Sequence, residues 1–231
     1  MNIDVILDIV LSLIAVFTAI VLHEVAHGYV AWRLGDPTAK NSGRLTLNPI
    51  AHVDPIGTLL IPITLAIFNL PLFGWAKPVP INPRYFRNPF RGMLLVSIAG
   101  PGTNIALALL AAAIGRLILL AVPNSMTFGE AGSFSSNVIA ALFYLLGMFV
   151  MYNVLLALFN LIPIPPLDGS RVLTYFLPTE GRRVMLQLER YGFLILIGII
   201  FLGGLQFLFR AIDPIARGLL GTQWLYILLY G

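Results

Sequence analysis

Residues Phe17 to Leu34 read FTAIVLHEVAHGYVAWRL, an apolar stretch with two histidines and a glutamate in its interior. It belongs to a longer apolar run at 4–33, which exceeds the roughly 20 residues that a helix needs to cross a bilayer. Ionisable groups inside such a helix are costly and usually functional. The stretch therefore predicts a membrane helix that carries a functional site.

The ionisable residues have the spacing HEXXH. His23 and His27 are four residues apart, so their imidazoles project from one face of a helix, with Glu24 about 100 degrees round from His23. Two neutral imidazoles can bind zinc while the adjacent carboxylate takes a proton from water and passes it to a leaving amine. Chance placement of two histidines is the alternative, which the cost of polar groups in lipid disfavours. We expect His23 and His27 to be zinc ligands and Glu24 to be the general base.

A hydrolytic zinc site needs a third protein ligand. The candidates are Asp168, in FNLIPIPPLDGS, and His52, in LNPIAHVDPIGT. Asp168 is favoured because it follows an apolar span and a proline break, and such breaks place free backbone groups where a cavity is lined. An Asp-Gly pair alone would indicate only a turn or a helix start. His52 and Asp54 could form a pair that orients a ligand imidazole, but turn capping is the favoured role for them.

The composition is that of an integral membrane protein. Of the 231 residues, 58% are hydrophobic and 10% are charged, and the mean hydropathy is +0.91. Sixteen prolines and twenty-one glycines predict interrupted helices and loops at membrane depth. The absence of cysteine excludes disulfides, thiolate catalysis and cysteine zinc sites. The formal charge of +4 is scattered over short loops, which argues against nucleic-acid binding.

Four apolar runs are long enough to span a bilayer, at 4–33, 92–122, 137–161 and 189–210. Two others, 56–72 and 212–230, are short or interrupted and could span, re-enter or lie at the interface. We expect an all-α polytopic membrane protein with about five to six membrane helices, together with a re-entrant loop or short β segments. It should form one membrane domain, 1–231, with a core at about 4–177 and further membrane segments at 189–231.

Basic residues indicate the orientation, because they favour the cytoplasmic side of a span. Arg33, Lys40 and Arg44 follow the first helix, whose start is acidic. We therefore expect an amino terminus outside the cell membrane and a site that is accessible from the cytoplasmic side. At 1.5 Å per residue, His27 would lie roughly 9 Å and His23 roughly 15 Å below the level of Arg33, a depth that cytoplasmic water could reach.

Three pieces of the chain together resemble the site-2 protease family of intramembrane zinc metalloproteases, in its small bacterial form. They are HEVAH, AGPGTN at Ala99 to Asn104, and FNLIPIPPLDGSRV at Phe159 to Val172. GRLTLNPIAHVDPIGT and FGWAKPVPINP add to the likeness, which covers about residues 20–175.

The resemblance implies a catalytic site. It implies one zinc ion per chain, with His23, His27 and Asp168 as ligands and Glu24 as the general base. It also places Asn160 near the substrate backbone or the oxyanion.

Other residues are candidates for substrate contact. In GWAKPVP the two prolines forbid a helix and leave backbone groups free, so that Gly74 and Trp75 would belong to an edge segment that pairs with an unwound substrate. The alternative is an interfacial loop that Trp75 anchors at the headgroups. Asn104 and the small residues of AGPG could contact substrate, although close helix packing is the favoured role for them.

These observations predict an intramembrane endopeptidase that hydrolyses transmembrane proteins or peptides in the lipid bilayer. A zinc or proton-coupled transporter is the alternative, but transporters commonly show inverted repeats with polar groups spread through both halves, whereas here the polar groups cluster. A catalytically idle scaffold has no reason to keep both Glu24 and the ligand set. The sequence does not indicate the natural substrate, the regulators or the oligomeric state.

Overall fold

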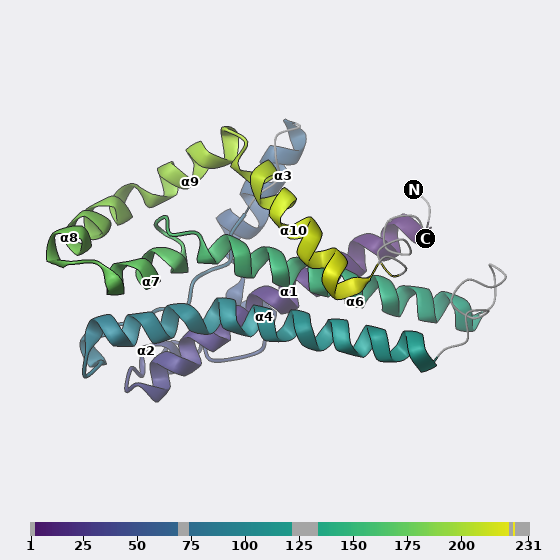
Figure 1. Ribbon diagram of the computed structural model, residues 1–231, viewed down its shortest axis with the longest axis horizontal. Helices are drawn as coiled ribbons and strands as arrows, with labels where there is room; N and C mark the ends of the chain where they lie inside the picture. Colours follow the sequence, from purple (N-terminus) through teal and green to yellow (C-terminus); the bar gives the residue numbers. More distant parts are fainter. Residues whose placement is uncertain (1–2, 69–73, 122–133, 222–223, 225–231) are drawn as a thin grey trace. The chain divides into compact units, whose positions relative to one another are not determined.

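The protein is built from helices (Figure 1). The structure, a computed structural model, describes residues 3–68, 74–121, 134–221 and 224, and no strand occurs in these ranges. The all-α prediction is therefore confirmed. The longest helices of the protein in these ranges are α1 (Ile3–Arg33), α4 (Pro89–Ala121) and α6 (Phe134–Leu161). In lipid a helix satisfies its own backbone hydrogen bonds, which explains why apolar runs of this length take this form.

Shorter elements complete the chain. Between α1 and α4 these are α2 (Thr38–Asn41), η1 (Pro49–His52), η2 (Pro55–Leu60), α3 (Ile61–Ile67) and η3 (Pro83–Tyr85). After α6 they are α7 (Asp168–Phe176), α8 (Thr179–Leu188), η4 (Glu189–Tyr191), α9 (Gly192–Phe201) and α10 (Gly204–Leu220).

Four helical segments within the described ranges are long and apolar enough to cross a membrane: Ile6–Arg33, Pro89–Ala121, Val138–Leu161 and Thr179–Phe201. The first three coincide with predicted spans. The fourth differs from the predicted 189–210, because it begins earlier and ends before a turn at Leu202 and Gly203. Gly203 has a φ of +89°, a conformation that glycine adopts without strain and that ends α9.

The two uncertain segments are shorter helices. In 56–72, η2 and α3 have six and seven residues, which at 1.5 Å each span about 20 Å, less than the roughly 30 Å of hydrocarbon. This length favours the re-entrant or interfacial alternatives, although residues 69–73 lie outside the described ranges. In 212–230, α10 contains Pro214 and ends at Leu220, and most of the remainder lies outside the description.

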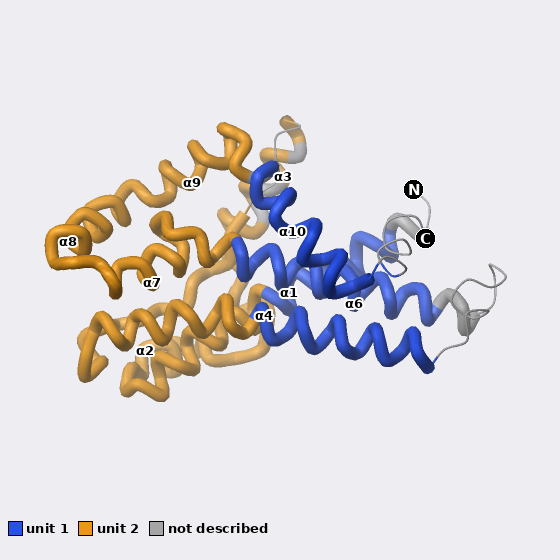
Figure 2. The backbone as a smooth tube through the Cα atoms, in the orientation of Figure 1, with its two compact units in different colours: residues 1–19, 104–158, 206–231 blue, residues 20–103, 159–205 orange. Residues whose placement is uncertain are grey.

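The chain divides into two compact units (Figure 2). Unit 1 comprises residues 1–19, 104–158 and 206–231, and unit 2 comprises residues 20–103 and 159–205. HEXXH and the LDG sequence both belong to unit 2, so the candidate site can be described within that unit alone.

Polar and small residues hold unit 1 together. Asn104 is fully buried, and its amide donates to Asn153 Oδ1 at 2.7 Å, which links α4 to α6. Trp224 is also fully buried, donates from Nε1 to the Phe143 carbonyl at 3.1 Å, and lies so close to Gly115 that a Cβ there would meet its ring at 2.0 Å. Between membrane helices such close approach replaces the hydrophobic effect as the source of association.

Arg116 joins α4 to the end of α10. Its guanidinium donates to the carbonyls of Leu219 at 2.9 Å and Gly218 at 2.5 Å. The last carbonyls of a helix have no partner within the helix, so Arg116 caps α10.

Candidate metal centre

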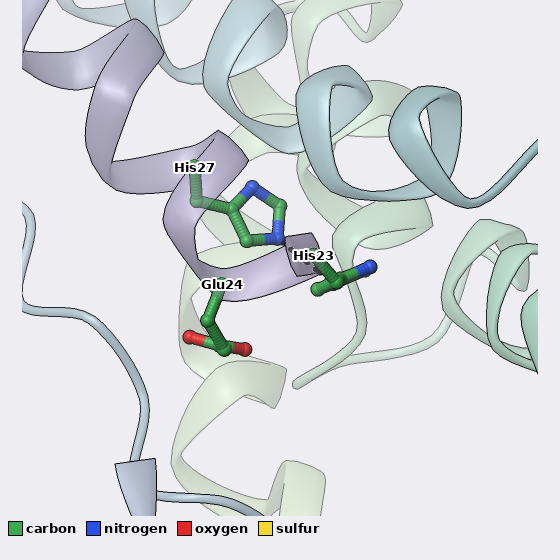
Figure 3. Close-up of side chains that lie close together, drawn as sticks. All are labelled: His23, Glu24 and His27. Atoms are coloured by element: carbon green, nitrogen blue, oxygen red, sulfur yellow. Dashed lines mark hydrogen bonds between the residues drawn. The ribbon is translucent and has the colours of Figure 1, made fainter. Parts of the chain in front are cut away.

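The carboxyl half of α1 presents the two histidines and the glutamate of HEXXH (Figure 3). The imidazoles of His23 and His27 lie side by side, with their Nε2 atoms 3.0 Å apart, and both side chains are buried. The Glu24 carboxylate projects beside them, with ligand atoms of all three residues within 4.8 Å of one another. The helical spacing has therefore placed these groups as predicted.

Asp168 completes the cluster from a distant part of the sequence. Its Oδ2 atom lies 3.3 Å from His23 Nε2 and 3.1 Å from His27 Nε2. Asp168 is the first residue of α7, where the helix dipole favours a negative charge. The structure thus brings together His23, His27 and Asp168, the three residues expected to hold a metal.

The residues around Asp168 explain how the chain reaches this position. After α6 ends at Leu161, a turn closed by the Leu167 N–H to the Ile164 carbonyl leads directly into α7. A Cβ at Gly169 would lie 2.2 Å from the Leu161 carbonyl oxygen, so only glycine fits where α7 folds back on the end of α6. The Ser170 hydroxyl donates to the Leu167 carbonyl at 2.7 Å and fixes the first turn of α7.

A neighbouring carbonyl sets the tautomer of His27. Its Nδ1–H donates to the Val96 carbonyl of α4 at 2.7 Å, so Nε2 faces His23 and Asp168, where it donates to Asp168 when protonated and can bind a metal when neutral. Such a partner on the opposite ring nitrogen is the usual means by which proteins orient a metal-binding histidine.

The donor set fits a tetrahedral zinc ion. Bonds of about 2.0–2.2 Å to nitrogen and oxygen imply about 3.3–3.5 Å between ligand atoms, close to the observed separations of 3.0, 3.1 and 3.3 Å. Lone pairs and a carboxylate this close repel one another unless a cation or a proton lies between them. Two imidazoles and one carboxylate would leave a fourth position for water.

Asp168 is ready to act as an anionic ligand. Burial opposes its charged form, but with protons on the imidazole nitrogens the hydrogen bonds from His23 and His27 outweigh burial and lower the pKa of the carboxyl to about 2. The carboxylate is therefore ionised at neutral pH, as metal binding requires.

Asp54 caps a helix start, as the sequence favoured, and His52 binds the backbone of its own loop. The His52 Nε2–H donates to the Thr46 carbonyl at 2.9 Å. The Asp54 carboxylate accepts the N–H groups of Ile56 at 2.9 Å and Gly57 at 2.8 Å, which caps the start of η2.

The candidates for substrate contact lie in different settings. Gly74 is exposed and Trp75 is half-buried, with its ring 5.1 Å from that of Phe193. Asn160 is half-buried near the end of α6. Asn104 belongs to unit 1, where it makes the hydrogen bond to Asn153 described above.

Sequence analysis missed the role of Gly100. A Cβ at this position of α4 would lie 2.4 Å from His27 Nε2 and 2.6 Å from His23 Cε1, so only glycine leaves room for the imidazole pair. The small residues of AGPG were a signal for close packing, but they did not indicate what packs there.

We expect Gly100→Ala to weaken zinc binding by more than about tenfold, because outer partners of metal ligands commonly contribute 10–100-fold and this methyl group would displace the ligands themselves. Gly102→Ala is the matched control, since nothing lies within 4 Å of a Cβ there. Zinc titration of the two purified variants checks the prediction. Equal affinities would show that the imidazoles move aside without loss.

Comparisons with known proteins identify the family of this chain. The model of peptidase family M50 matches residues 11–203. YwhC of Bacillus subtilis is 42% identical over 187 residues, which cover 81% of this chain and 77% of YwhC. Rip2 of Mycolicibacterium smegmatis is 32% identical over 177 residues, which cover 76% of this chain but only 61% of Rip2. Both relatives carry the provisional name of zinc metalloprotease.

No solved structure matches the chain significantly. The family match covers most of the sequence and includes all the residues of the cluster, from His23 to Asp168. The chain therefore belongs to peptidase family M50, the site-2 protease family.

Proposed function

We propose that this protein is an intramembrane zinc metalloendopeptidase with one zinc ion, held by His23, His27 and Asp168. The observation that carries the proposal is the convergence of these three ligand atoms to within 3.3 Å, beside the Glu24 carboxylate on a helix that can span a membrane. The name shared by YwhC and Rip2 supports zinc as the metal. The transporter alternative has no support from these relatives.

Zinc, when bound, supplies Lewis acidity that acidifies water and polarises a peptide carbonyl. Glu24 takes the proton from water as the water oxygen bonds to the carbonyl carbon, and it delivers that proton to the nitrogen as the C–N bond breaks. Asp168 is held in place by the start of α7. The His27 ring is oriented by its hydrogen bond to the Val96 carbonyl. Asn160 would donate to the developing oxyanion or to the substrate backbone.

The substrate is a peptide or protein, and we propose that it is a transmembrane segment that unwinds beside residues 75–81. Pro78 and Pro80 keep this segment extended, because each fixes its own φ and restricts the residue before it. The N–H groups of Trp75 and Lys77 donate inward, to the carbonyls of Gly57 and His52. Alternate backbone groups would then face outward and pair with an unwound substrate. Contacts from Gly74, Trp75 and Asn104 to substrate remain predictions.

The protein is a multi-pass membrane protein, and we propose that it lies in the cell membrane with the amino terminus outside and the site open to the cytoplasm. At the end of α1, Tyr29 and Trp32 are exposed, and the Lys40 ammonium lies 4.8 Å from the Trp32 ring centre. Aromatic and basic residues gather in this way at a membrane interface. The match of one family model to residues 11–203 supports a single protease domain, 1–231.

Ser42→Cys tests this orientation, because the natural chain has no cysteine and Ser42 is exposed. In intact cells we expect an impermeant maleimide to leave the new thiol unlabelled, and permeabilised cells to give full labelling. Labelling of intact cells would place this loop outside and reverse the proposed topology.

The function itself is tested with purified protein and a labelled transmembrane peptide in proteoliposomes. We expect cleavage that requires zinc and stops when a chelator removes it. If a panel of membrane peptides stays intact while zinc crosses the proteoliposome membrane, the transporter alternative holds instead.

A further inference from the structure

One backbone group of the chain contacts the proposed general base directly. The Val79 N–H donates to Glu24 Oε2 at 2.9 Å, across 55 residues of sequence. Val79 lies between Pro78 and Pro80, neither of which has an N–H, so it offers the only backbone donor of this tripeptide. The Pro-Val-Pro sequence therefore presents a single, isolated donor to the carboxylate.

The side chain of Val79 is seated against α1. Val79 is buried, and a Cβ built at Gly28 would lie 3.0 Å from Val79 Cγ1. Gly28 is one helical turn beyond Glu24 and shares its face of α1. The missing side chain at Gly28 thus sets how closely Val79, and with it the N–H donor, approaches the helix that carries Glu24.

The segment is fixed on both sides of this contact. Before Val79, the Lys77 N–H donates to the His52 carbonyl at 2.9 Å. After it, the Asn82 N–H donates to the fully buried Asp36 carboxylate at 2.6 Å. Val79 is therefore held between two anchored points, and its distance from Glu24 depends on the fit at Gly28.

We propose that Val79 is a positioning residue for the general base, and that its contact with Gly28 determines how closely it approaches α1. The N–H occupies Oε2 of Glu24 and limits the rotation of a side chain with three free torsions, so that Oε1 is left to exchange the proton. This inference rests on the proposed role of Glu24. It predicts a larger effect on the chemical step than on substrate binding, in which residues 75–81 take part, and no effect on zinc binding.

Gly28→Ala tests the proposal. The new methyl group would lie 3.0 Å from Val79 Cγ1 and 3.3 Å from Ala39 Cβ, and the closer contact would push Val79 outward by a few tenths of an ångström. Since a 1 Å misplacement in a catalytic site can cost about 100-fold, we expect kcat to fall about three- to tenfold, with a smaller change in KM and an unchanged zinc content. Gly28→Val should lower kcat further, and Gly198→Ala, which adds a methyl group in open space, should leave it unchanged.

A second substitution distinguishes positioning from general damage. In Gly28→Ala combined with Val79→Ala, the smaller residue 79 leaves room for the new methyl group and retains its N–H, so kcat should recover most of the loss. A wild-type kcat for Gly28→Ala, a loss that persists in the double variant, or a loss of zinc would each overturn the inference. A wild-type protein that cleaves no peptide would instead overturn the proposed function.

Discussion

Replacing Glu24 with glutamine is expected to lower the rate of peptide cleavage by about 10²- to 10⁴-fold, the usual contribution of a general acid or base. Glutamine has nearly the same size as glutamate, and its carbonyl oxygen can still accept the Val79 N–H that Glu24 Oε2 accepts. It cannot take a proton from water. Zinc binding should therefore survive while the chemical step fails.

Initial rates with a labelled transmembrane peptide, and the zinc content of the same samples, measure this effect. Glu180→Gln is the matched control, because Glu180 is an exposed residue of α8 whose ion pair with Arg183 lies at the surface. It should cleave at the wild-type rate. A Glu24→Gln variant that retains zinc and cleaves within tenfold of the wild type would remove Glu24 from the mechanism.

Asp168→Asn is expected to reduce zinc affinity by more than about 100-fold, because even the outer partners of metal ligands contribute 10–100-fold. The substitution keeps the shape of the side chain and removes the charge that lies 3.1–3.3 Å from both imidazoles. Zinc titration, or metal content after dialysis, measures the loss.

The controls for Asp168→Asn are substitutions of Asp54 and of His52, the other candidate for the third ligand. Asp54→Asn makes the same chemical change at the start of η2, and asparagine caps a helix as well as aspartate does, so zinc affinity should not change. His52→Ala should also retain zinc, because the His52 ring contacts the Thr46 carbonyl. Loss of zinc with His52→Ala but not with Asp168→Asn would make His52 the third ligand.

Local periodicity made one part of the site predictable. A helix brings residues four apart onto one face, so HEXXH alone places His23 beside His27. The position of Asp168 was harder to predict, because its approach to the two histidines depends on how the chain turns back from the end of α6 at Gly169. Its selection over His52 relied on the apolar span and proline break before it and on the family resemblance.

Two kinds of contact left little trace in the sequence: hydrogen bonds of backbone groups, and close approaches that need a glycine. Every residue has a backbone carbonyl, and every residue except proline has a backbone N–H. No sequence pattern therefore singles out the Val96 carbonyl or the Val79 N–H. Gly100 was visible only as one of several small residues in AGPG.

Hydropathy also misjudged a helix boundary. Residues 191–209 are apolar except for Tyr191 and Gln206, and only the geometry at Gly203 separates α9 from α10. Transfer free energies describe how a side chain partitions, and they carry no information about a bend between two apolar helices.

The cap that Arg116 provides has a consequence for biosynthesis. Its acceptors, the carbonyls of Gly218 and Leu219, are about a hundred residues further along the chain. When α4 enters the bilayer these acceptors have not been translated, so the guanidinium must first be solvated by headgroups or water. The docking of α10 then exchanges that solvation for two hydrogen bonds, so the cap can form only after α10 has been made.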